Sequence, residues 1–320
     1  MEYLAKKILI SLLDRMTNPS GKQLLSILIY HRVLTEFDPL RPGEPTALEF
    51  SWQMENLSRY FNPMGLADAI RLLKEGKLPK RAICVTFDDG YADNEAIALP
   101  ILKNWNIPAT VFVATEFLND GRMWNDTVIE SFRNLSGNVD LSSLDLGSFN
   151  IQSDRDRIQA INSILPKIKY LQIEERTRTV EFIGSLVKKL PNNLMLTSDQ
   201  VINLHNNGIE IGGHTASHPI LQNLDITSSR IEIEKGKIAL EKLIRQPVRF
   251  FAYPNGIVGK DFGLEHSQLV KELGFEVAVS TQVGVSMKTS NHYLLPRFTP
   301  WDKTPMKFMV RLLLNQKNYI

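Results

Sequence analysis

The chain has 320 residues, of which 43% are hydrophobic and 22% charged, a composition typical of globular proteins with a sizeable core. Its formal net charge of +2 gives no reason to expect a nucleic-acid partner. The single cysteine, Cys84, excludes an internal disulfide framework and a cysteine-based zinc cluster. Because Cys84 lies in the apolar run 83–87, we expect a buried, inert thiol.

The N-terminal segment has the spacing of an amphipathic helix, with Leu4, Ile8 and Leu12 on one face. Its apolar stretch is shorter than a secretory signal requires and far short of the ~20 residues of a spanning helix. We expect this helix to dock on its own domain, with peripheral membrane contact as the alternative. We therefore expect the protein in the cytoplasm, where it could act at the inner face of the membrane.

Short β-rich runs recur along the chain and predict strands at 25–30, 82–87, 109–114, 209–212, 249–253 and 276–280. Several of these runs are apolar throughout, as expected of parallel strands that are covered on both faces. Helical patterns lie between them, at 51–60, 97–105 and 228–244. The last pattern predicts that Ile231, Ile238, Leu240 and Leu243 face the core. This alternation predicts an α/β protein with a parallel sheet or barrel in one domain, residues 1–320.

The stretch from about 124 to 198 interrupts this alternation, because it has no convincing strand. Apolar residues with helical spacing occur at Ile158, Ile161, Leu165 and Ile168, and again at Val180, Ile183 and Val187. Residues 135–150 are rich in Ser, Asn, Asp and Gly, which is typical of a loop. We therefore expect a mostly helical insertion that borders the active site.

Two adjacent carboxylates, Asp88 and Asp89, follow the strand expected at 82–87 in the sequence TFDDG. The carboxyl end of a strand is where parallel α/β folds place their reactive groups. A turn that caps a helix is the alternative. The two side chains must point in different directions, so one can bind a cation while the other transfers a proton.

Two histidines, His214 and His218, follow the strand expected at 209–212. If the chain turns helical here, their i and i+4 spacing puts both on one face, where they can bind one metal. Together with Asp89 they make a three-ligand set for a catalytic divalent ion, whose activated water attacks an amide carbonyl while Asp88 takes the proton. A surface or core pair of histidines is the alternative.

The TFDDG motif followed by HTASH resembles the polysaccharide deacetylase (NodB-homology) family of carbohydrate esterases. Further similarity lies in IYHRV at 29–33, FAYPNG at 251–256 and LPR at 295–297, so that the resemblance covers roughly 26–301. The resemblance implies a distorted (β/α) barrel of about seven strands. It also implies Asp88 as general base, a metal ion, most often zinc, held by Asp89, His214 and His218, and an N-acetylated carbohydrate as substrate.

The segment with Tyr253, Pro254 and Asn255 resembles the loop that lines the family's pocket and supplies a backbone N–H to the oxyanion. Many members carry an arginine that orients the base where this chain has Ala252. We hypothesise that Arg297 takes that role.

The general acid is a second departure, because no late Leu-x-His is present. The chain instead resembles the branch associated with exopolysaccharides, whose acid histidine lies in an early Tyr-His motif. His31 is then the acid, and a strand-end histidine bound to backbone is the alternative. Trp124 and Trp301 are candidates for stacking on sugar, with packing as the alternative. Asp93 is expected to start a helix.

The leading function is therefore removal of N-acetyl groups from a polysaccharide or its lipid-linked precursor. Alternatives with the same chemistry are hydrolysis of another small amide or imide, or of an O-acetyl ester. An alternative of another class is a catalytically silent carbohydrate-binding barrel. The presence of Asp88, Asp89, His214 and His218 together argues against that barrel, because binding alone needs no proton-transfer carboxylate beside a metal group. The oligomeric state is left open.

Overall fold

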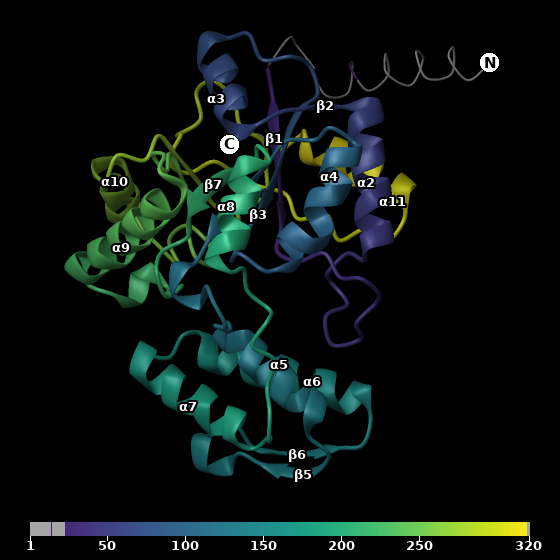
Figure 1. Ribbon diagram of the computed structural model, residues 1–320, viewed down its shortest axis with the longest axis vertical. Coiled ribbons are helices and arrows are strands. Elements are labelled where there is room, and N and C mark those ends of the chain that lie inside the picture. The colour runs from purple at the N-terminus through teal and green to yellow at the C-terminus, as the bar shows by residue number, and fades with distance from the viewer. Residues whose placement is uncertain (1–13, 15–22, 319–320) are drawn as a thin grey trace.

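The computed structural model describes residue 14 and residues 23–318. Their main feature is a parallel sheet in the order β1-β3-β4-β7-β8-β9, with the short β2 also paired to β3 (Figure 1). The strands are β1 (Leu25–Tyr30), β2 (Asn62–Pro63), β3 (Ala82–Phe87), β4 (Ala109–Val113), β7 (Glu210–Gly213), β8 (Phe250–Ala252) and β9 (Val277–Val279). The parallel α/β architecture predicted from the sequence is confirmed, and the strand bounds differ from the predicted ones by at most one residue.

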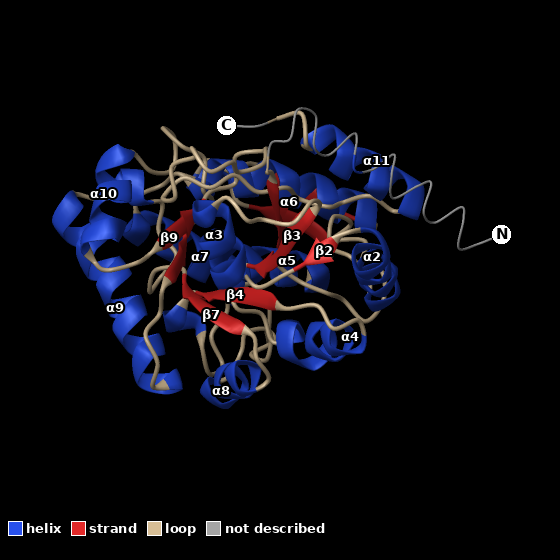
Figure 2. Ribbon diagram, turned by 90° about the horizontal axis from the view of Figure 1, so that it is seen from above, coloured by secondary structure: helices blue, strands red, loops and turns tan. Residues whose placement is uncertain are grey.

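The sheet curls until a segment without regular structure closes it. Residues 295–298 form parallel bridges to both outer strands, Leu295 to Val279 of β9 and Phe298 to Leu28 of β1. Seen from above, the strands form a curved wall with helices outside it (Figure 2). The distorted barrel is therefore confirmed, and Arg297 lies in the segment that closes it.

Helices surround this barrel: α2 (Ala47–Tyr60), α3 (Leu66–Glu75), α4 (Leu99–Asn104), α8 (Ser198–Asn206), α9 (Ile226–Ile244), α10 (Leu264–Glu272) and α11 (Pro305–Asn315). Alternate residues of each strand face two separate cores. On β3, Ile83 and Val85 pack in the core beneath the outer helices, whereas Cys84 packs in the inner core with residues of α3. Both faces of the strands are thus covered, which explains their apolar sequences. Cys84 is 1% exposed, as expected.

The predicted inner face of α9 is partly wrong. Ile231 and Ile238 are 59% and 57% exposed, whereas Ile233, Gly236 and Leu240 are buried. Because buried positions recur every three or four residues, the pattern through Ile233 and Leu240 places Ile231 and Ile238 on the opposite side of the helix.

The insertion forms a lobe with its own hydrophobic core, drawn in teal below the barrel in Figure 1. It comprises α5 (Trp124–Asn134), β5 (Gly137–Asp140), β6 (Ser148–Ile151), α6 (Asp154–Lys169) and α7 (Ile173–Ser185). The loop predicted at 135–150 is wrong, since β5 and β6 pair there as an antiparallel hairpin. Val139 and Ile151 are the buried residues of these short strands, and the polar residues between them obscure the alternation. That the chain forms one domain stays a prediction.

Within the residues that the structure describes, no helix combines the length and hydropathy needed to cross a membrane. The amphipathic helix predicted around Leu4, Ile8 and Leu12 lies outside the described residues.

Candidate active site

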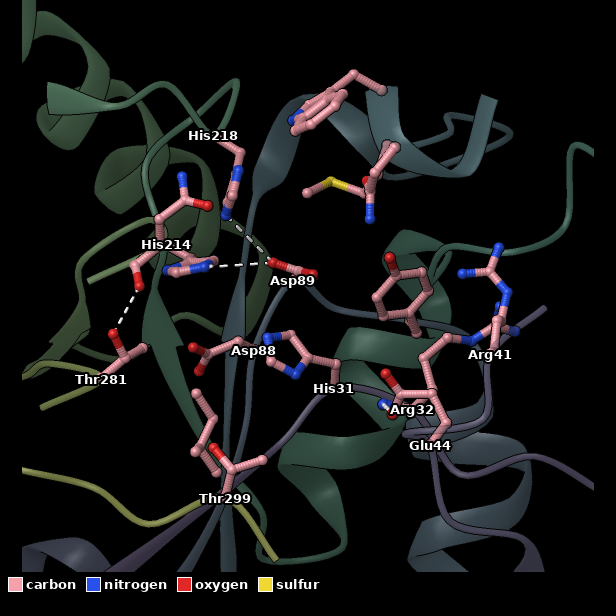
Figure 3. Close-up of a pocket in the computed structure, with 16 residues that line it drawn as sticks. His31, Arg32, Arg41, Glu44, Asp88, Asp89, His214, His218, Thr281 and Thr299 are labelled. Atoms are coloured by element: carbon pink, nitrogen blue, oxygen red, sulfur yellow. Dashed lines mark hydrogen bonds and ion pairs between the residues drawn. The ribbon is translucent and has the colours of Figure 1, made fainter. Parts of the chain in front are cut away.

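The two carboxylates after β3 point to different partners because the backbone turns sharply between them. Asp88 still donates its N–H to Tyr30 of β1 (N to O 2.9 Å), whereas Asp89 and Gly90 adopt the left-handed conformation, with φ of 73° and 87°. At Gly90 a Cβ would lie 3.0 Å from the Val113 side chain, so a glycine fits this turn. Asp88 continues the inward-facing side of β3, and Asp89 faces the two histidines (Figure 3).

Asp88 forms a buried, bidentate ion pair with Arg297. Both oxygens accept from the guanidinium, Oδ1 from Nη1 and Oδ2 from Nη2, each at 2.7 Å. Arg297 is 1% exposed and also donates from Nε to the Ser280 carbonyl. Burial raises the pKa of Asp88, but the charges of Arg297 and His214 outweigh it and hold the pKa below its ordinary value. The carboxylate is therefore fixed in position and ionised at neutral pH.

Asp89, His214 and His218 form a buried group of metal-ligand type. The Nε2 atoms of His214 and His218 lie 3.3 and 3.4 Å from Asp89 Oδ1, and the three ligand atoms are all within 4.8 Å of one another. Ligands about 2.1 Å from a tetrahedral ion are about 3.4 Å apart, so the spacing fits. The Ala252 carbonyl can only accept, so His214 Nδ1 donates to it at 2.7 Å and Nε2 keeps its lone pair toward Asp89.

The histidines meet through a loop, and not through the helical turn that the sequence analysis took as a condition for residues 214–218. Thr215 and His218 have φ of 64° and 54°, which no α-helix contains. Thr215 Oγ1 accepts the His218 N–H at 3.0 Å, and Glu232 of α9 accepts the N–H groups of Ala216 and Ser217. The loop is therefore held in shape by its own side chain and by α9.

The protonation states of this group suit a cation. Burial raises the pKa of Asp89, but hydrogen bonding to His214 and the nearby histidine charges outweigh it and lower the pKa well below its ordinary value. Burial lowers the pKa of His218 to about 3, against the opposing effect of Asp89. Burial also acts to lower the pKa of His214, but Asp88 and Asp89 raise it above its ordinary value. At neutral pH the group offers an ionised carboxylate and a neutral His218 imidazole.

These side chains open into one cavity of about 320 Å³. His31 lies just past β1 and lines the cavity with Asp88 and Asp89 (Figure 3), and its carbonyl accepts from Asn94 Nδ2 at 2.8 Å. Trp124, the first residue of α5, brings the insertion to the same cavity, and Asn255 lines it from the loop after β8. Predicted catalytic, metal and substrate residues are thus brought together from both halves of the chain.

Tyr253, Pro254 and Trp301, which the sequence predicts to contact substrate, do not line the cavity. The Tyr253 ring stacks on Phe262 at 3.6 Å, its hydroxyl donates to the Tyr293 carbonyl, and its N–H donates to Val279 of β9. No donor of Tyr253 is left for an oxyanion. Trp301 is 54% exposed and lies under the Arg311 guanidinium.

The sequence analysis missed the charged wall opposite the metal group. Arg41 Nη2 lies 2.6 Å from Asp126 Oδ1 and 3.0 Å from Glu130 Oε1, and Arg32 Nε lies 2.8 Å from Asp93 Oδ2. Arg32 and Arg41 line the cavity. Only Arg32 carried a signal, its place in the IYHRV motif.

Asp93 stands just before the π-helical turn Asn94–Ala98, but its side chain makes no cap. It accepts instead from the Arg32 guanidinium and the Val33 N–H. Burial raises the pKa of Asp93 to about 6, although Arg32 opposes this shift.

The chain is similar to several known proteins. YxkH of Bacillus subtilis is 21% identical over 274 residues, covering 85% of this chain and 70% of that protein. The poly-β-1,6-N-acetyl-D-glucosamine N-deacetylase of Staphylococcus epidermidis is 31% identical over 109 residues, 30% of this chain and 38% of that enzyme. The structure of the deacetylase PplD of Streptococcus pyogenes, determined with acetate, has the same fold, with 18% identity and a TM-score of 0.61 over 91% of this chain and 99% of PplD. The family model for polysaccharide deacetylases matches residues 75–139 and 154–278, more than half of the chain. The chain belongs to the polysaccharide deacetylase family.

Proposed function

We propose that this protein removes N-acetyl groups from sugar units of a polysaccharide or of its lipid-linked precursor. The observation that carries the proposal is the meeting of two groups in one cavity: Asp88, clamped by Arg297, and the buried group Asp89, His214 and His218. The N-acetylglucosamine polymer that gives the Staphylococcus epidermidis enzyme its name supports an N-acetylated hexosamine as the substrate unit.

The residues present fit a divalent metal ion, for which we propose zinc. The donor set of two imidazoles and one carboxylate suits zinc, and the tautomer of His214 directs its free nitrogen toward Asp89. A divalent ion held there supplies Lewis acidity, which acidifies a coordinated water and polarises a carbonyl oxygen.

The remaining steps fall to side chains that line the cavity. Asp88 is the general base, and the Arg297 fork keeps it ionised and oriented. His31, at the same end of β1 and β3, gives the proton that the leaving nitrogen needs. Among the residues described, the N–H of Asn255 has no acceptor, and in our proposal it is the N–H of the segment 253–255 that binds the oxyanion.

A silent carbohydrate-binding barrel is the weaker explanation of this geometry. Binding a neutral sugar gives no reason to bury a carboxylate–guanidinium pair beside three metal-type ligands, since burying charged groups is costly. The cytoplasmic location expected from the sequence stays a prediction.

The test is acetate release from short N-acetylglucosamine oligomers by zinc-loaded protein. Asp88→Asn keeps the shape of the side chain but removes the base, so we expect turnover to fall by about 100-fold or more. Chelation should abolish release. Asp68→Asn, an exposed aspartate on α3 with a 67% exposed side chain, is the matched control and should release acetate at the unmodified rate.

Release that survives both chelation and Asp88→Asn would contradict the mechanism. No release, in protein that demonstrably holds one zinc ion, would reject N-acetylglucosamine oligomers and direct the search to other acylated substrates.

A further inference from the structure

A second cavity, of about 370 Å³, adjoins the candidate active site. It lies between the insertion lobe, through α5 and α7, and the barrel loops that follow β4 and β7 (Figure 1). Trp124 lines both cavities, and Ser217 in the second cavity is the chain neighbour of His218 in the first. The two cavities therefore adjoin at Trp124.

Arg176 of α7 lines this second cavity and has no anionic partner. The residue is 6% exposed, and within the described part of the chain it has neither an ion pair nor a side-chain hydrogen bond. Its guanidinium carbon lies 5.3 Å from the centre of the Trp124 ring, and burial lowers its pKa. Two other arginines are buried in the described part of the chain, Arg41 and Arg297. Each has a carboxylate oxygen within 2.7 Å of its guanidinium.

A second guanidinium shares the cavity without a carboxylate. Arg122 donates to two neutral oxygens, the Thr127 hydroxyl at 2.9 Å and the Pro191 carbonyl at 2.7 Å, and no described carboxylate is within ion-pair distance. Of the cavity's acids, Glu116 is paired with Lys235 and Glu181 is exposed. Among the described residues, neither guanidinium of this cavity is therefore in ion-pair contact with a carboxylate.

A buried guanidinium without a counter-ion costs free energy, because its lost hydration is not replaced. Such a group persists where a ligand supplies the missing anion, and the planar guanidinium suits the paired oxygens of phosphate and carboxylate. We propose that Arg176, assisted by Arg122, binds an anionic group, phosphate or carboxylate, next to the N-acetylated sugar unit, so that the enzyme prefers anionic saccharides. This rests on the proposed function, because it assigns the N-acetylated unit to the first cavity.

Binding to the full-length protein, measured by calorimetry, tests the subsite directly. The probes are a neutral N-acetylglucosamine oligomer, a hyaluronan oligomer in which glucuronate alternates with N-acetylglucosamine, and UDP-N-acetylglucosamine. At least one anionic probe should bind more tightly than the neutral oligomer. Arg176→Met should lower the affinity for that probe by about 10- to 100-fold. Which probe responds tells whether carboxylate or phosphate is the ligand.

Arg178→Met is the matched control, because Arg178 lies on the same helix but lines a different cavity, on the far side of α7. It should bind the anionic probe as the unmodified protein does. Arg176→Lys, which keeps the charge but not the fork, should restore part of the affinity. A Tm of Arg176→Met equal to or above that of the unmodified protein would support a ligand-binding role, since the variant removes an unpaired buried charge.

Two results would overturn the inference: anionic probes that bind no more tightly than the neutral oligomer, or affinity for them that is unchanged in Arg176→Met. Acetate release without any preference for anionic substrates would also reject the subsite and leave the proposed function standing. Arg176-dependent binding without acetate release from any of the three probes would support the subsite and reject these N-acetylated saccharides as substrates.

Discussion

The ion pair between Arg297 and Asp88 joins two residues that are far apart in the sequence. The two residues are 209 positions apart, yet their side chains meet because residues 295–298 close the barrel between β9 and β1, and β1 is the neighbour of β3. The guanidinium forms two parallel bonds to the carboxylate, a geometry that an ammonium group cannot reproduce. This geometry supports the proposal that Arg297 orients Asp88.

Arg297→Lys should lower kcat by about 100-fold, because the base Asp88 loses its orientation. Zinc content should be unchanged, because the three proposed metal ligands are all retained. Arg297→Met should in addition lower the free energy of unfolding by about 3–5 kcal/mol, since it leaves a buried carboxylate unpaired. Acetate release, metal analysis and urea unfolding measure the three quantities. Full activity in Arg297→Lys would show that Asp88 does not need the two parallel hydrogen bonds from a guanidinium.

The sequence motifs predicted which acidic and histidine side chains form this site. They did not predict which backbone and side-chain atoms line the cavity. Asp88, Asp89, His214 and His218 follow strands, and parallel strands end at one edge of a sheet, so their meeting followed from the sequence. Which N–H of the segment 253–255 is free to bind an oxyanion did not follow from the sequence, because only the structure shows that Val279 accepts the N–H of Tyr253.

The charged wall with Arg32 and Arg41 could not be predicted from the sequence for a different reason. The carboxylates that pair with Arg41 come from the insertion, and Asp93, which pairs with Arg32, lies 61 positions further along the chain. No periodic pattern links residues so far apart.

At the scale of elements, α9 positions the loop that carries both histidines. Gly236 of α9 faces this loop, and a Cβ at that position would lie 2.6 Å from the Thr215 carbonyl oxygen. The helix can approach so closely only because the residue has no side chain. Glu232, one turn earlier, accepts the backbone N–H groups of the same loop.

Two opposing effects decide the stability of Gly236→Ala: higher helix propensity and poorer packing. Alanine favours a helix over glycine by about 1 kcal/mol, but displacing backbone in a packed interior costs about 1–3 kcal/mol. We expect the variant to be less stable and to bind zinc more weakly, because the His214–His218 loop must move. Ile238→Ala, at an exposed position of the same helix, is the control and should leave zinc affinity unchanged. A more stable variant with unaltered zinc affinity would show that α9 does not set the loop.

Elements with a strong hydrophobic period were predictable, and those shaped by tertiary contact were not. A strand such as β3 is apolar on both faces and stands out in the sequence, whereas β5 and β6 bury one residue each and do not stand out. The buried face of α9 depends on the fit of Gly236 against the loop. Hydrophobic period alone therefore selected Ile231 and Ile238, which are exposed.

At the scale of the whole molecule, the candidate metal group connects strands and loops from distant parts of the chain. Asp89 follows β3 and both histidines follow β7, so an ion bound to all three ties these segments together. A ligand that binds only the folded state stabilises it by about 2.7 kcal/mol when its free concentration is about 100 times its Kd.

This stabilisation should depend on pH, because in the metal-free protein a proton on His214 competes with the metal. Burial acts to lower the pKa of His214, but Asp88 and Asp89 raise it above its ordinary value. A raised folded-state pKa gives stability that is complete below the unfolded pKa, about 6.5, and is lost as pH rises through the folded value. Chelated protein should therefore lose this stabilisation as pH rises from about 6.5 through the raised pKa of His214, and above that pKa zinc binds without having to displace the proton.

The Tm difference between zinc-loaded and chelated protein should widen as pH rises from about 6 to about 8. Differential scanning calorimetry of both forms across this range measures it. Asp89→Asn removes a proposed zinc ligand together with a carboxylate that raises the pKa of His214, so it should abolish most of the zinc-induced shift. A zinc-induced shift that is constant with pH, or that persists in Asp89→Asn, would place the stabilising metal outside this group.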